Sequence, residues 1–472
     1  MVELINLIKR SGNSLNSRLT QREINHGSYA PKIALIQLGS NSTQAVINSF
    51  PGLGPLYISS HLKANGYNPS FYDFTAKGSN DLPKDPKDGI YNFDIYGFSS
   101  NIAQFREAKR MMGEIKEKNP NAVYVVGGPF PSRSPHYGLE AGFDVVGRGE
   151  GEDVMLEVAN TFPNIKRGEI SAKNFPDPNF FPDWSAINPL DYIYQLEGKR
   201  CINVMTKRGN CPFHCTFCAL QNEGVSKLRM RTIDNVVEEA QFLRETYGFG
   251  SLAIYDDEVL ITKKRDHELF KKLKEIDMPY RCMTRANLAD RADIELLKAT
   301  GCKEICIGLE SADPFIHEIV VEKETTIEHH TEFLKNAREV GLRTKVYLII
   351  GMPSESRRTI ENTKRWLRQN RPENFDISVF TPYPGAPIYN NKQHYEIDWD
   401  QEKLEEIWFS GGAQEECAVW TPYLTSKDIL EIKAEMEHEF NRGKSGVTPY
   451  WGPIEDAPNK LKLKPVKDYC PA

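Results

Sequence analysis

The run Thr206-Lys-Arg-Gly-Asn-Cys-Pro-Phe-His-Cys-Thr-Phe-Cys218 places three cysteines, Cys211, Cys215 and Cys218, in a C-x3-C-x2-C pattern. Thiolates this close in sequence can converge on one metal centre. Three thiolates hold three irons of a four-iron, four-sulfur cube and leave one iron free for a small molecule. A zinc site needs a fourth protein ligand, usually from a second paired Cys/His motif, and none follows at such spacing. The spacing therefore predicts a three-thiolate metal site.

This stretch resembles the radical S-adenosylmethionine (SAM) superfamily, down to an aromatic residue, Phe217, before the last cysteine. The resemblance implies that Cys211, Cys215 and Cys218 ligate a [4Fe-4S] cluster, with Phe217 among the cofactor contacts. It also implies that SAM chelates the open iron through its amino and carboxylate groups. One electron from the cluster would then break the sulfonium bond and give a 5'-deoxyadenosyl radical.

The composition describes an ordinary globular chain. Its 472 residues suffice for two or three domains, and it is 40% hydrophobic and 26% charged. A net charge of −6 gives no argument for a nucleic-acid surface, and nine cysteines without a regular framework fit a reducing compartment. Neither a signal peptide nor a run of about 18 apolar residues is found, so we expect a cytoplasmic protein without a membrane span.

Strand and helix patterns alternate through the first third of the chain. Strands are expected at Lys32–Leu38, Pro69–Phe74, Asp94–Ser99, Ala122–Val126 and Phe143–Val146, and helices at Leu53–Asn65, Ile102–Lys118 and Gly151–Ala159. This rhythm predicts an α/β, doubly wound parallel sheet. Ligands of such sheets lie beyond the carboxyl ends of the strands, where four loops would meet. These loops are Gly39–Ser42, Ser99–Asn101, Gly127–Pro129 and Gly147–Gly149.

The motifs Asp94-x-x-Gly97-x-Ser99, Val125-Val-Gly-Gly-Pro129 and Asp144-Val-Val-Gly-Arg-Gly-Glu-Gly-Glu152 resemble the cobalamin-binding domain that precedes the barrel in one radical SAM subclass. The resemblance implies a Rossmann-like corrinoid-binding domain. The Asp-x-His-x-x-Gly signature is absent from the loop after the first strand, so cobalamin would bind without a His ligand. A domain that has lost its cofactor is the alternative. The implied cobalamin contacts are Ser99, Gly127, Gly128, Gly149 and Glu150.

The βα rhythm resumes after an ordered linker. Six strands are expected at Ile202–Thr206, Ser251–Tyr255, Tyr280–Thr284, Glu304–Gly308, Thr344–Ile350 and Asp376–Phe380, each but the last followed by a helix. Six parallel strands predict a partial (β/α)6 TIM-type barrel with its site at the carboxyl ends. The expected divisions are an N-terminal lead 1–31, the corrinoid domain 32–160, the linker 161–198, the barrel 199–390, and a small mainly helical C-terminal cap and tail 391–472.

Two strand ends carry expected SAM contacts. Gly308-Leu-Glu310-Ser311 resembles the family's Gly-x-Glu-Ser element, which implies that Gly308, Glu310 and Ser311 contact SAM. Gly351, in Gly-Met-Pro353, would turn the backbone against the adenine. The alternatives are a solvated carboxylate at Glu310 and a simple turn at Gly351.

The remaining candidate catalytic residues also follow strands. Asp256-Asp257-Glu258 repel one another and would either act on the substrate or pair with Arg285. Arg285 could equally clamp a substrate carboxylate. Tyr383, in Pro-Tyr-Pro-Gly385, would face the substrate cavity or belong to a rigid turn.

The leading hypothesis is a cobalamin-dependent radical SAM methyltransferase, which would move a methyl group from methylcobalamin to an unactivated carbon, or to phosphorus, of a small-molecule intermediate. An external one-electron reductant of the flavodoxin or ferredoxin type would be its partner. The alternatives are a radical cyclase or rearrangement enzyme without methyl transfer, and a non-catalytic iron–sulfur or corrinoid sensor.

Overall fold

The computed structural model describes residues 30–39, 50–77, 80–83, 89–209, 211–220, 227–410 and 416–441. The expected lead before residue 30, the tail after 441 and residues 40–42 of the first glycine loop lie outside these ranges. None of the helices in the described part of the chain combines the length and the hydropathy that a membrane span requires.

The first domain is a six-stranded parallel sheet in the order β2-β1-β3-β4-β5-β6. Its strands are β1 Ile33–Gln37, β2 Ser70–Asp73, β3 Ile95–Ser99, β4 Val123–Gly127, β5 Val145–Arg148 and β6 Gly168–Ser171. The strand order reverses between β1 and β3, which is where doubly wound folds bind ligands. The predicted doubly wound sheet is confirmed.

Helices cover both faces of this sheet. The helices are α3 Leu53–Ala64, α4 Phe105–Lys118, α5 Pro129–Arg133, α6 Pro135–Glu140 and α7 Gly151–Thr161. One apolar cluster joins α7 to the sheet through Val154 and Val158, and the other joins α4 through Met111 and Ile115. A strand covered on both faces needs apolar side chains throughout, and all of β1 is buried.

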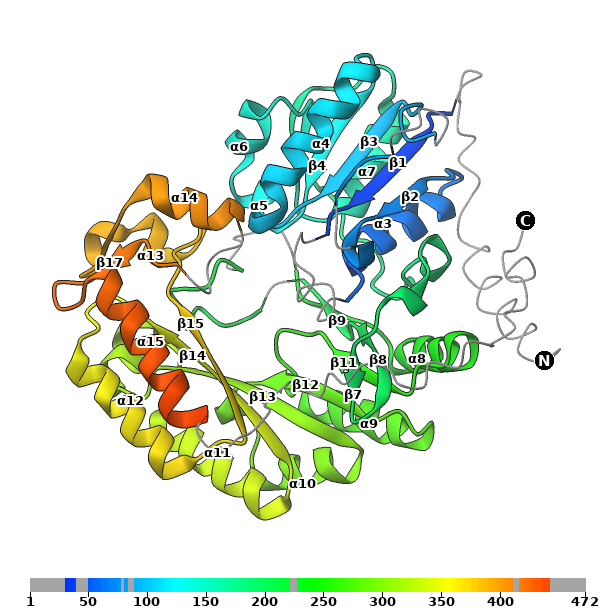
Figure 1. Ribbon diagram of the computed structural model, residues 1–472. Coiled ribbons are helices and arrows are strands. Elements are labelled where there is room, and N and C mark those ends of the chain that lie inside the picture. The colour runs from blue at the N-terminus through cyan, green and yellow to red at the C-terminus, as the bar shows by residue number, and fades with distance from the viewer. Residues whose placement is uncertain are drawn as a thin grey trace.

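The second domain is a curved, open sheet that forms a partial barrel (Figure 1). Its parallel strands run in the order β15-β14-β13-β12-β11-β8, and β7 pairs antiparallel with β8 at one edge. The strands are β7 Gln195–Leu196, β8 Lys199–Val204, β11 Ser251–Ile254, β12 Tyr280–Thr284, β13 Cys302–Glu310, β14 Arg343–Ile350 and β15 Asn374–Val379. The six predicted strands are present.

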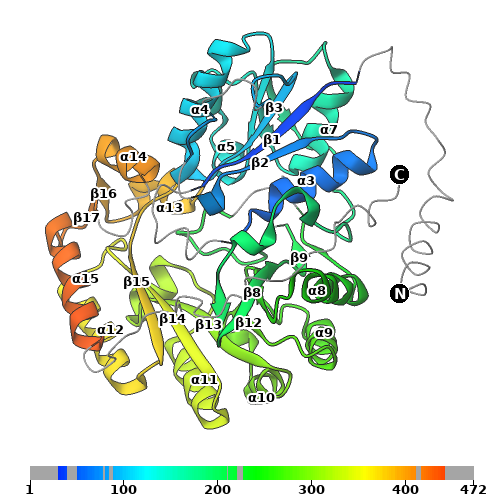
Figure 2. The ribbon, with the colours of Figure 1, turned by 45° about the vertical axis from the view of Figure 1, so that its right-hand side comes forward.

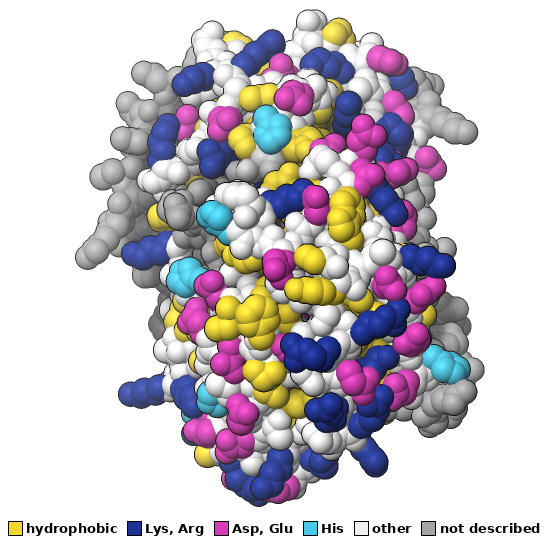
Figure 3. Space-filling view, turned by 90° about the vertical axis from the view of Figure 1, so that its left-hand side faces the viewer, with side chains coloured by type: hydrophobic (Ala, Val, Ile, Leu, Met, Phe, Trp, Pro, Cys, Tyr) yellow, Lys and Arg dark blue, Asp and Glu magenta, His cyan; other side chains and the backbone are white. Residues whose placement is uncertain are grey.

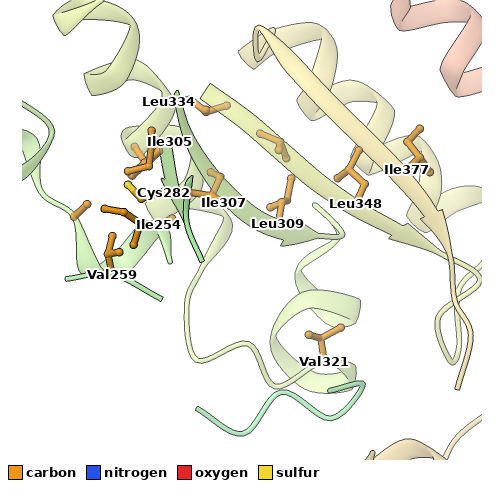
Figure 4. Packing of buried hydrophobic residues seen from close by; sticks show 14 of the residues in the cluster. Ile254, Val259, Cys282, Ile305, Ile307, Leu309, Val321, Leu334, Leu348 and Ile377 are labelled. Atoms are coloured by element: carbon orange, nitrogen blue, oxygen red, sulfur yellow. The ribbon is translucent and has the colours of Figure 1, made fainter. Parts of the chain in front are cut away.

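Helices follow the first five parallel strands of the barrel and pack on its outer face. They are α8 Ile233–Tyr247, α9 Lys263–Glu275, α10 Arg291–Ala299, α11 Ile327–Val340 and α12 Arg357–Asn370. Capping boxes start α10, α11 and α12, and Gly248 and Gly341 end α8 and α11 at positive φ. Apolar side chains from successive strands fill the space beneath these helices (Figure 4).

The linker and the cap differ in part from expectation. The expected ordered linker 161–198 contains two strands, β6, which extends the first sheet, and β7, which pairs with β8. The cap holds α13 Pro387–Asn390, α14 Gln401–Ser410 and α15 Ser426–Asn441, with a small ribbon of β16 Asp398–Trp399 and β17 Val419–Trp420. Helix α15 lies against α12, and ion pairs join the two helices. Acidic and basic side chains are interspersed on the face of the molecule that Figure 3 shows.

The two domains face each other across their functional edges. Figures 1 and 2 show the first sheet above the barrel, with the carboxyl ends of its central strands directed toward the barrel. Helix α14 of the cap reaches the first domain, where Phe409 packs against Phe105, Phe130 and Tyr137. The loops expected to hold the two cofactors therefore lie on facing sides.

Candidate active site

The three clustered cysteines lie in the Cys loop, residues 211–218, which follows β8 at the carboxyl end of the barrel. Cys215 is buried, and Cys211 and Cys218 are half-buried. Burial, with a smaller contribution from Glu258 and Asp257, raises the pKa of the Cys211 thiol to about 12. Burial also raises the pKa of Cys218. Such thiols lose their protons readily only when a cation binds them, as metal ligands do.

The Cys loop is fixed at its centre by Thr216. The Thr216 amide donates to the Val321 carbonyl (3.0 Å), and its hydroxyl donates to the Val320 carbonyl (2.6 Å). The Ile388 amide in turn donates to the Thr216 carbonyl (3.0 Å). Two distant segments thus hold the centre of the Cys loop in place.

The described residues contain no group of three His, Cys, Asp or Glu side chains placed to hold a single metal ion. Thiolates that ligate an iron–sulfur cube bind different irons, so they need not converge on one point. The donor set of three thiols on one fixed loop fits such a cluster.

Arg285, at the end of β12, supplies positive charge beside the Cys loop. It is 2% exposed, donates from Nη1 to Cys215 Sγ (3.4 Å) and stacks 4.0 Å from the centre of the Phe213 ring. The alternative that Arg285 pairs with the Asp256-Asp257-Glu258 run is wrong, because no ion pair joins them among the described residues. Its Nε and Nη2 are buried without a hydrogen-bond partner in the described structure. Free donors beside a thiol fit the sulfides of a cluster or the carboxylate of SAM.

Glu310 ends β13 in a left-handed conformation (φ 64°) and forms a buried ion pair with Lys323. Its Oε1 lies 2.7 Å from Lys323 Nζ, and the two side chains are 8% and 6% exposed. A Cβ on Gly308 would overlap the Glu310 carboxylate and the Lys323 ammonium, so a side chain at this position would displace the pair. The Lys323 ammonium also lies 5.8 Å from the centre of the Phe217 ring. The alternative of a solvated Glu310 is therefore wrong.

The other two expected SAM contacts are engaged by neighbouring side chains. The hydroxyl of Ser311, which is 1% exposed, lies 3.3 Å from that of Thr363 on α12. Gly351 has φ 84°, and its amide donates to Glu355 Oε2 (2.5 Å). Both strand ends are rigid, and the missing side chain of Gly351 leaves room for Ile429 of the cap.

The three consecutive carboxyl groups after β11 have different surroundings. Asp256 is buried and accepts hydrogen bonds from the Thr206 amide (2.7 Å) and hydroxyl (2.5 Å), so it supports the approach to the Cys loop. Asp257 is exposed at the mouth, where partial desolvation and the Asp256 charge raise its pKa to about 6. Burial raises the pKa of Glu258 to about 7 against the lowering effect of Lys323.

Tyr383 lies under the cap. Its ring is half-buried and stacks on Trp408 of α14, with ring centres 6.4 Å apart, and burial raises its pKa. The Trp408 indole donates to the Pro382 carbonyl (3.1 Å), which fixes the turn. The structure therefore places Tyr383 between the barrel and the cap.

The glycine loops of the first domain gather at the carboxyl ends of β3, β4 and β5. Ser99 and Gly127 are paired in neighbouring strands, and the Ser100 amide donates to the Gly127 carbonyl (2.9 Å). Gly128 has φ 103° and packs so closely on Ser100 that a Cβ would lie 2.6 Å from its carbonyl oxygen. A Cβ on Gly127 would meet no atom nearer than 3.9 Å, so this edge stays open to a flat ligand. Gly149 adopts φ 85° in the adjacent loop.

Two basic residues at the site were not identified by any sequence motif. Lys323 follows a short π-helix, Phe315–Val320, and reaches Glu310 only through the fold. Arg133, at the end of α5, brings positive charge from the first domain close to Asp257 and Cys218. Its side chain packs on Gly385, and its Nε is buried without a partner in the described structure.

Two family models match this chain. Residues 45–159 match the B12 binding domain, and residues 207–367 match the radical SAM superfamily. The first range carries the glycine loops, and the second carries the Cys loop, Arg285, Glu310 and Gly351. The two matches fall on the two sides of the site described above.

Two relatives are 27% identical to the chain. One is an uncharacterised methyltransferase of Pyrococcus horikoshii, aligned over 63% of this chain and 68% of the relative. The other is the anaerobic magnesium-protoporphyrin IX monomethyl ester cyclase of Rubrivivax gelatinosus, aligned over 73% and 66%. The chain thus spans about two thirds of the length of each.

A solved structure shares the architecture. The radical S-adenosylmethionine methyltransferase TsrM of Kitasatospora setae, determined with cobalamin and a [4Fe-4S] cluster, superposes with a TM-score of 0.62. The superposition covers 78% of this chain and 81% of that one, at 15% identity, so it shows a common fold. The family models assign a [4Fe-4S] cluster and SAM to the barrel domain and cobalamin to the first domain. The chain therefore combines a domain that matches the radical SAM superfamily with a domain that matches the B12 binding domain.

Proposed function

We propose that the chain is a cobalamin-dependent radical SAM methyltransferase that acts on an unactivated carbon, or on phosphorus, of a small molecule. The observation that supports this most strongly is the facing arrangement of the two domains. The glycine loops of the B12-binding domain lie opposite the barrel mouth that carries the Cys loop (Figure 1). Both cofactors would then reach one shared site.

Three groups of residues would hold the cofactors. Cys211, Cys215 and Cys218 would ligate the cluster. SAM would lie against Phe217, Gly308, Glu310, Ser311 and Gly351, and cobalamin would lie against Ser99, Gly127, Gly128 and Gly149. When bound, these groups supply reductive cleavage of SAM and a transferable methyl group, which is chemistry that no amino-acid side chain provides.

The protein contributes charge, rigidity and a water-poor setting. Arg285 and Lys323 place positive charge near the Cys215 thiol and would offset the negative charge of a thiolate-ligated cluster. Glu310 is buried and ready to accept an ammonium group, and its present partner is the ammonium of Lys323. Asp257 is exposed at the mouth with a pKa of about 6, so it suits a proton acceptor near neutral pH. The role of Tyr383 would be to support the cap.

The relatives favour methyl transfer but also support one alternative. A methyltransferase and a cyclase match the chain at the same identity. A radical cyclase without methyl transfer is therefore the second candidate, and it uses the same cofactors. In both cases we infer a small-molecule substrate and a one-electron donor of the flavodoxin or ferredoxin type.

Labelled SAM separates the two candidates before the substrate is known. Anaerobically reconstituted protein would be incubated with hydroxocobalamin, a chemical reductant and SAM that carries a ¹³C-methyl group. A methyltransferase is expected to place the label on the added cobalamin, as read by mass spectrometry. Formation of 5'-deoxyadenosine with no label on cobalamin would contradict methyl transfer and favour the cyclase.

A further inference from the structure

The base of the Cys loop is a two-stranded ribbon, here called the stem ribbon. It consists of β9 Lys207–Arg208 before the loop and β10 Arg229–Met230 after it, paired antiparallel with Arg208 opposite Arg229. Gly209 has φ 105°, and a Cβ there would overlap the carbonyl of Lys227, so the two sides of the ribbon lie very close. A contact that fixes the stem ribbon therefore fixes the base of the Cys loop.

One carboxylate of the B12-binding domain contacts both sides of the stem ribbon. Glu150, in the loop between β5 and α7, has Oε1 2.7 Å from Arg229 Nη2 and Oε2 3.3 Å from Arg208 Nη2. Glu152, at the start of α7, forms a second ion pair with Arg208. These four side chains, the interdomain ion cluster, are only 4–11% exposed. Ion pairs this well buried are screened little by water or salt.

A tyrosine of the same domain extends the contact. The Arg208 guanidinium lies 4.3 Å from the centre of the Tyr57 ring on α3. The Tyr57 hydroxyl accepts a hydrogen bond from Arg231 Nη1 (3.4 Å), and Arg231 also pairs with Glu239 at 2.5 Å. Burial and the Glu239 charge raise the pKa of Tyr57, so its phenol stays neutral. The stem ribbon is thus held by both α3 and the β5–α7 loop.

The sequence places Glu150 directly after Gly149, in a loop expected to contact cobalamin. The structure instead directs its carboxylate to the two arginines of the stem ribbon. Removing the carboxylate would leave two buried guanidinium groups with one remaining carboxylate, Glu152. Unpaired buried charge is strongly unfavourable. We therefore expect the stem ribbon to separate from the loop between β5 and α7.

We propose that Glu150 is a positioning residue that fastens the base of the Cys loop to the B12-binding domain and thereby couples the two cofactor sites. A corrinoid bound at Gly127–Gly149 would order the backbone that carries Glu150. The ion pairs of Glu150 with the stem ribbon would then restrain the base of the Cys loop as well. By thermodynamic linkage the effect is reciprocal, so a formed cluster would also favour corrinoid binding. The coupling between the two cofactor sites rests on the proposed function, whereas the attachment of the stem ribbon by Glu150 does not.

Hydrogen exchange of the metal-free protein tests the fastening alone. Glu150→Gln is expected to speed amide exchange about tenfold in peptides that cover the two strands of the stem ribbon, residues 207–208 and 229–230, because the ribbon loses its shared partner. Glu152→Gln, which removes only one contact to Arg208, is expected to have a smaller effect. Glu169→Gln, which removes an exposed partner of Arg148 in the same domain, serves as the control and should leave these peptides unchanged. Unchanged exchange in Glu150→Gln, with the fold intact by circular dichroism, would overturn the proposal.

A second measurement tests the coupling. In reconstituted wild-type protein, hydroxocobalamin is expected to slow the loss of cluster absorbance to a chelator several-fold. Glu150→Gln is expected to bind hydroxocobalamin but to lose this protection. A variant that loses cobalamin affinity while its stem ribbon exchanges as in the wild type would show that Glu150 is a corrinoid ligand and would overturn the proposal. Failure of the proposed function looks different, because wild-type protein would then leave cobalamin unlabelled in the ¹³C-methyl SAM experiment, while the exchange experiment would still report on the contact between Glu150 and the stem ribbon.

Discussion

At the scale of single residues, the buried pair of Glu310 and Lys323 determines the charge balance of the site. We predict that Lys323→Met destabilises the metal-free protein by about 3–5 kcal/mol, because it leaves an uncompensated carboxylate in a site that water hardly reaches. The double variant Lys323→Met/Glu310→Gln is expected to recover much of this loss. Urea unfolding of the four proteins in this cycle measures the coupling.

The control for this cycle is an exposed pair. Lys427 and Glu431 lie 3.5 Å apart and are 84% and 52% exposed, so Lys427→Met is expected to change stability by less than about 0.5 kcal/mol. If the stability losses of the two single variants add up to the loss of the double variant, the two side chains do not act as a pair and the interpretation fails.

A second residue-scale prediction concerns pH. Glu355 is 1% exposed, and burial raises its pKa from 4.5 to about 8. The folded chain therefore holds this proton more tightly than the unfolded chain, and stability falls as pH rises from about 4.5 to about 8. Glu355→Gln is expected to remove this part of the decline, and its stability relative to the wild type should increase by a few kcal/mol, on the order of 3, between pH 5 and pH 9.

Chemical unfolding of both proteins across this pH range provides the measurement. The quantity of interest is the difference between variant and wild type, since other groups titrate equally in both. A difference that does not change with pH would show that Glu355 ionises normally and would contradict the raised pKa.

At the scale of elements, sequence patterns predicted those parts of the fold that repeat. Apolar, β-branched runs predicted the strands. The motifs at the ends of these runs predicted where the Cys loop, Glu310 and Gly351 lie. Helices α5 and α6 were not predicted because they are short and follow Gly127-Gly128, which was interpreted as a loop that contacts cobalamin. Proline at the first position of each was the available signal. Strand β6 has one buried residue, Ile170, and so lacked the apolar run of the other strands.

The site residues that were mispredicted depend on contacts between distant elements. Asp256 was expected near Arg285, but it instead accepts hydrogen bonds from Thr206. Lys323 reaches the site from the segment after a π-helix, and Arg133 reaches it from the other domain, so no local pattern could reveal either position. Side-chain partners of this kind are set by tertiary packing, which spacing along the chain does not encode.

The cap gives an element-scale prediction. Phe409 of α14 packs with ring centres 5.8–6.0 Å from Phe105, Phe130 and Tyr137 of the first domain. Phe409→Ala is expected to destabilise the protein by about 1–3 kcal/mol, since the ring is only partly buried. Calorimetry is expected to show two separated transitions where the wild type shows overlapping ones, because the link between cap and first domain weakens. A single unchanged transition would contradict a linking role for α14.

At the scale of the whole molecule, two domains that bind different cofactors present their loops to a common region. Each domain alone is a common α/β design, and neither fold implies a reaction by itself. The chemistry follows from their combination. The three-thiol loop on the barrel and the open glycine edge on the sheet are joined by the interdomain ion cluster and by the cap.

Reductive cleavage of SAM tests the central claim most directly. Anaerobically reconstituted protein would be mixed with SAM and dithionite, and 5'-deoxyadenosine would be quantified by liquid chromatography. The wild type is expected to form it, and the variant Cys211→Ala/Cys215→Ala/Cys218→Ala is expected to lose both the visible absorption of the cluster and all product. Retained 5'-deoxyadenosine formation in the triple variant, or none from cluster-loaded wild-type protein, would contradict the account.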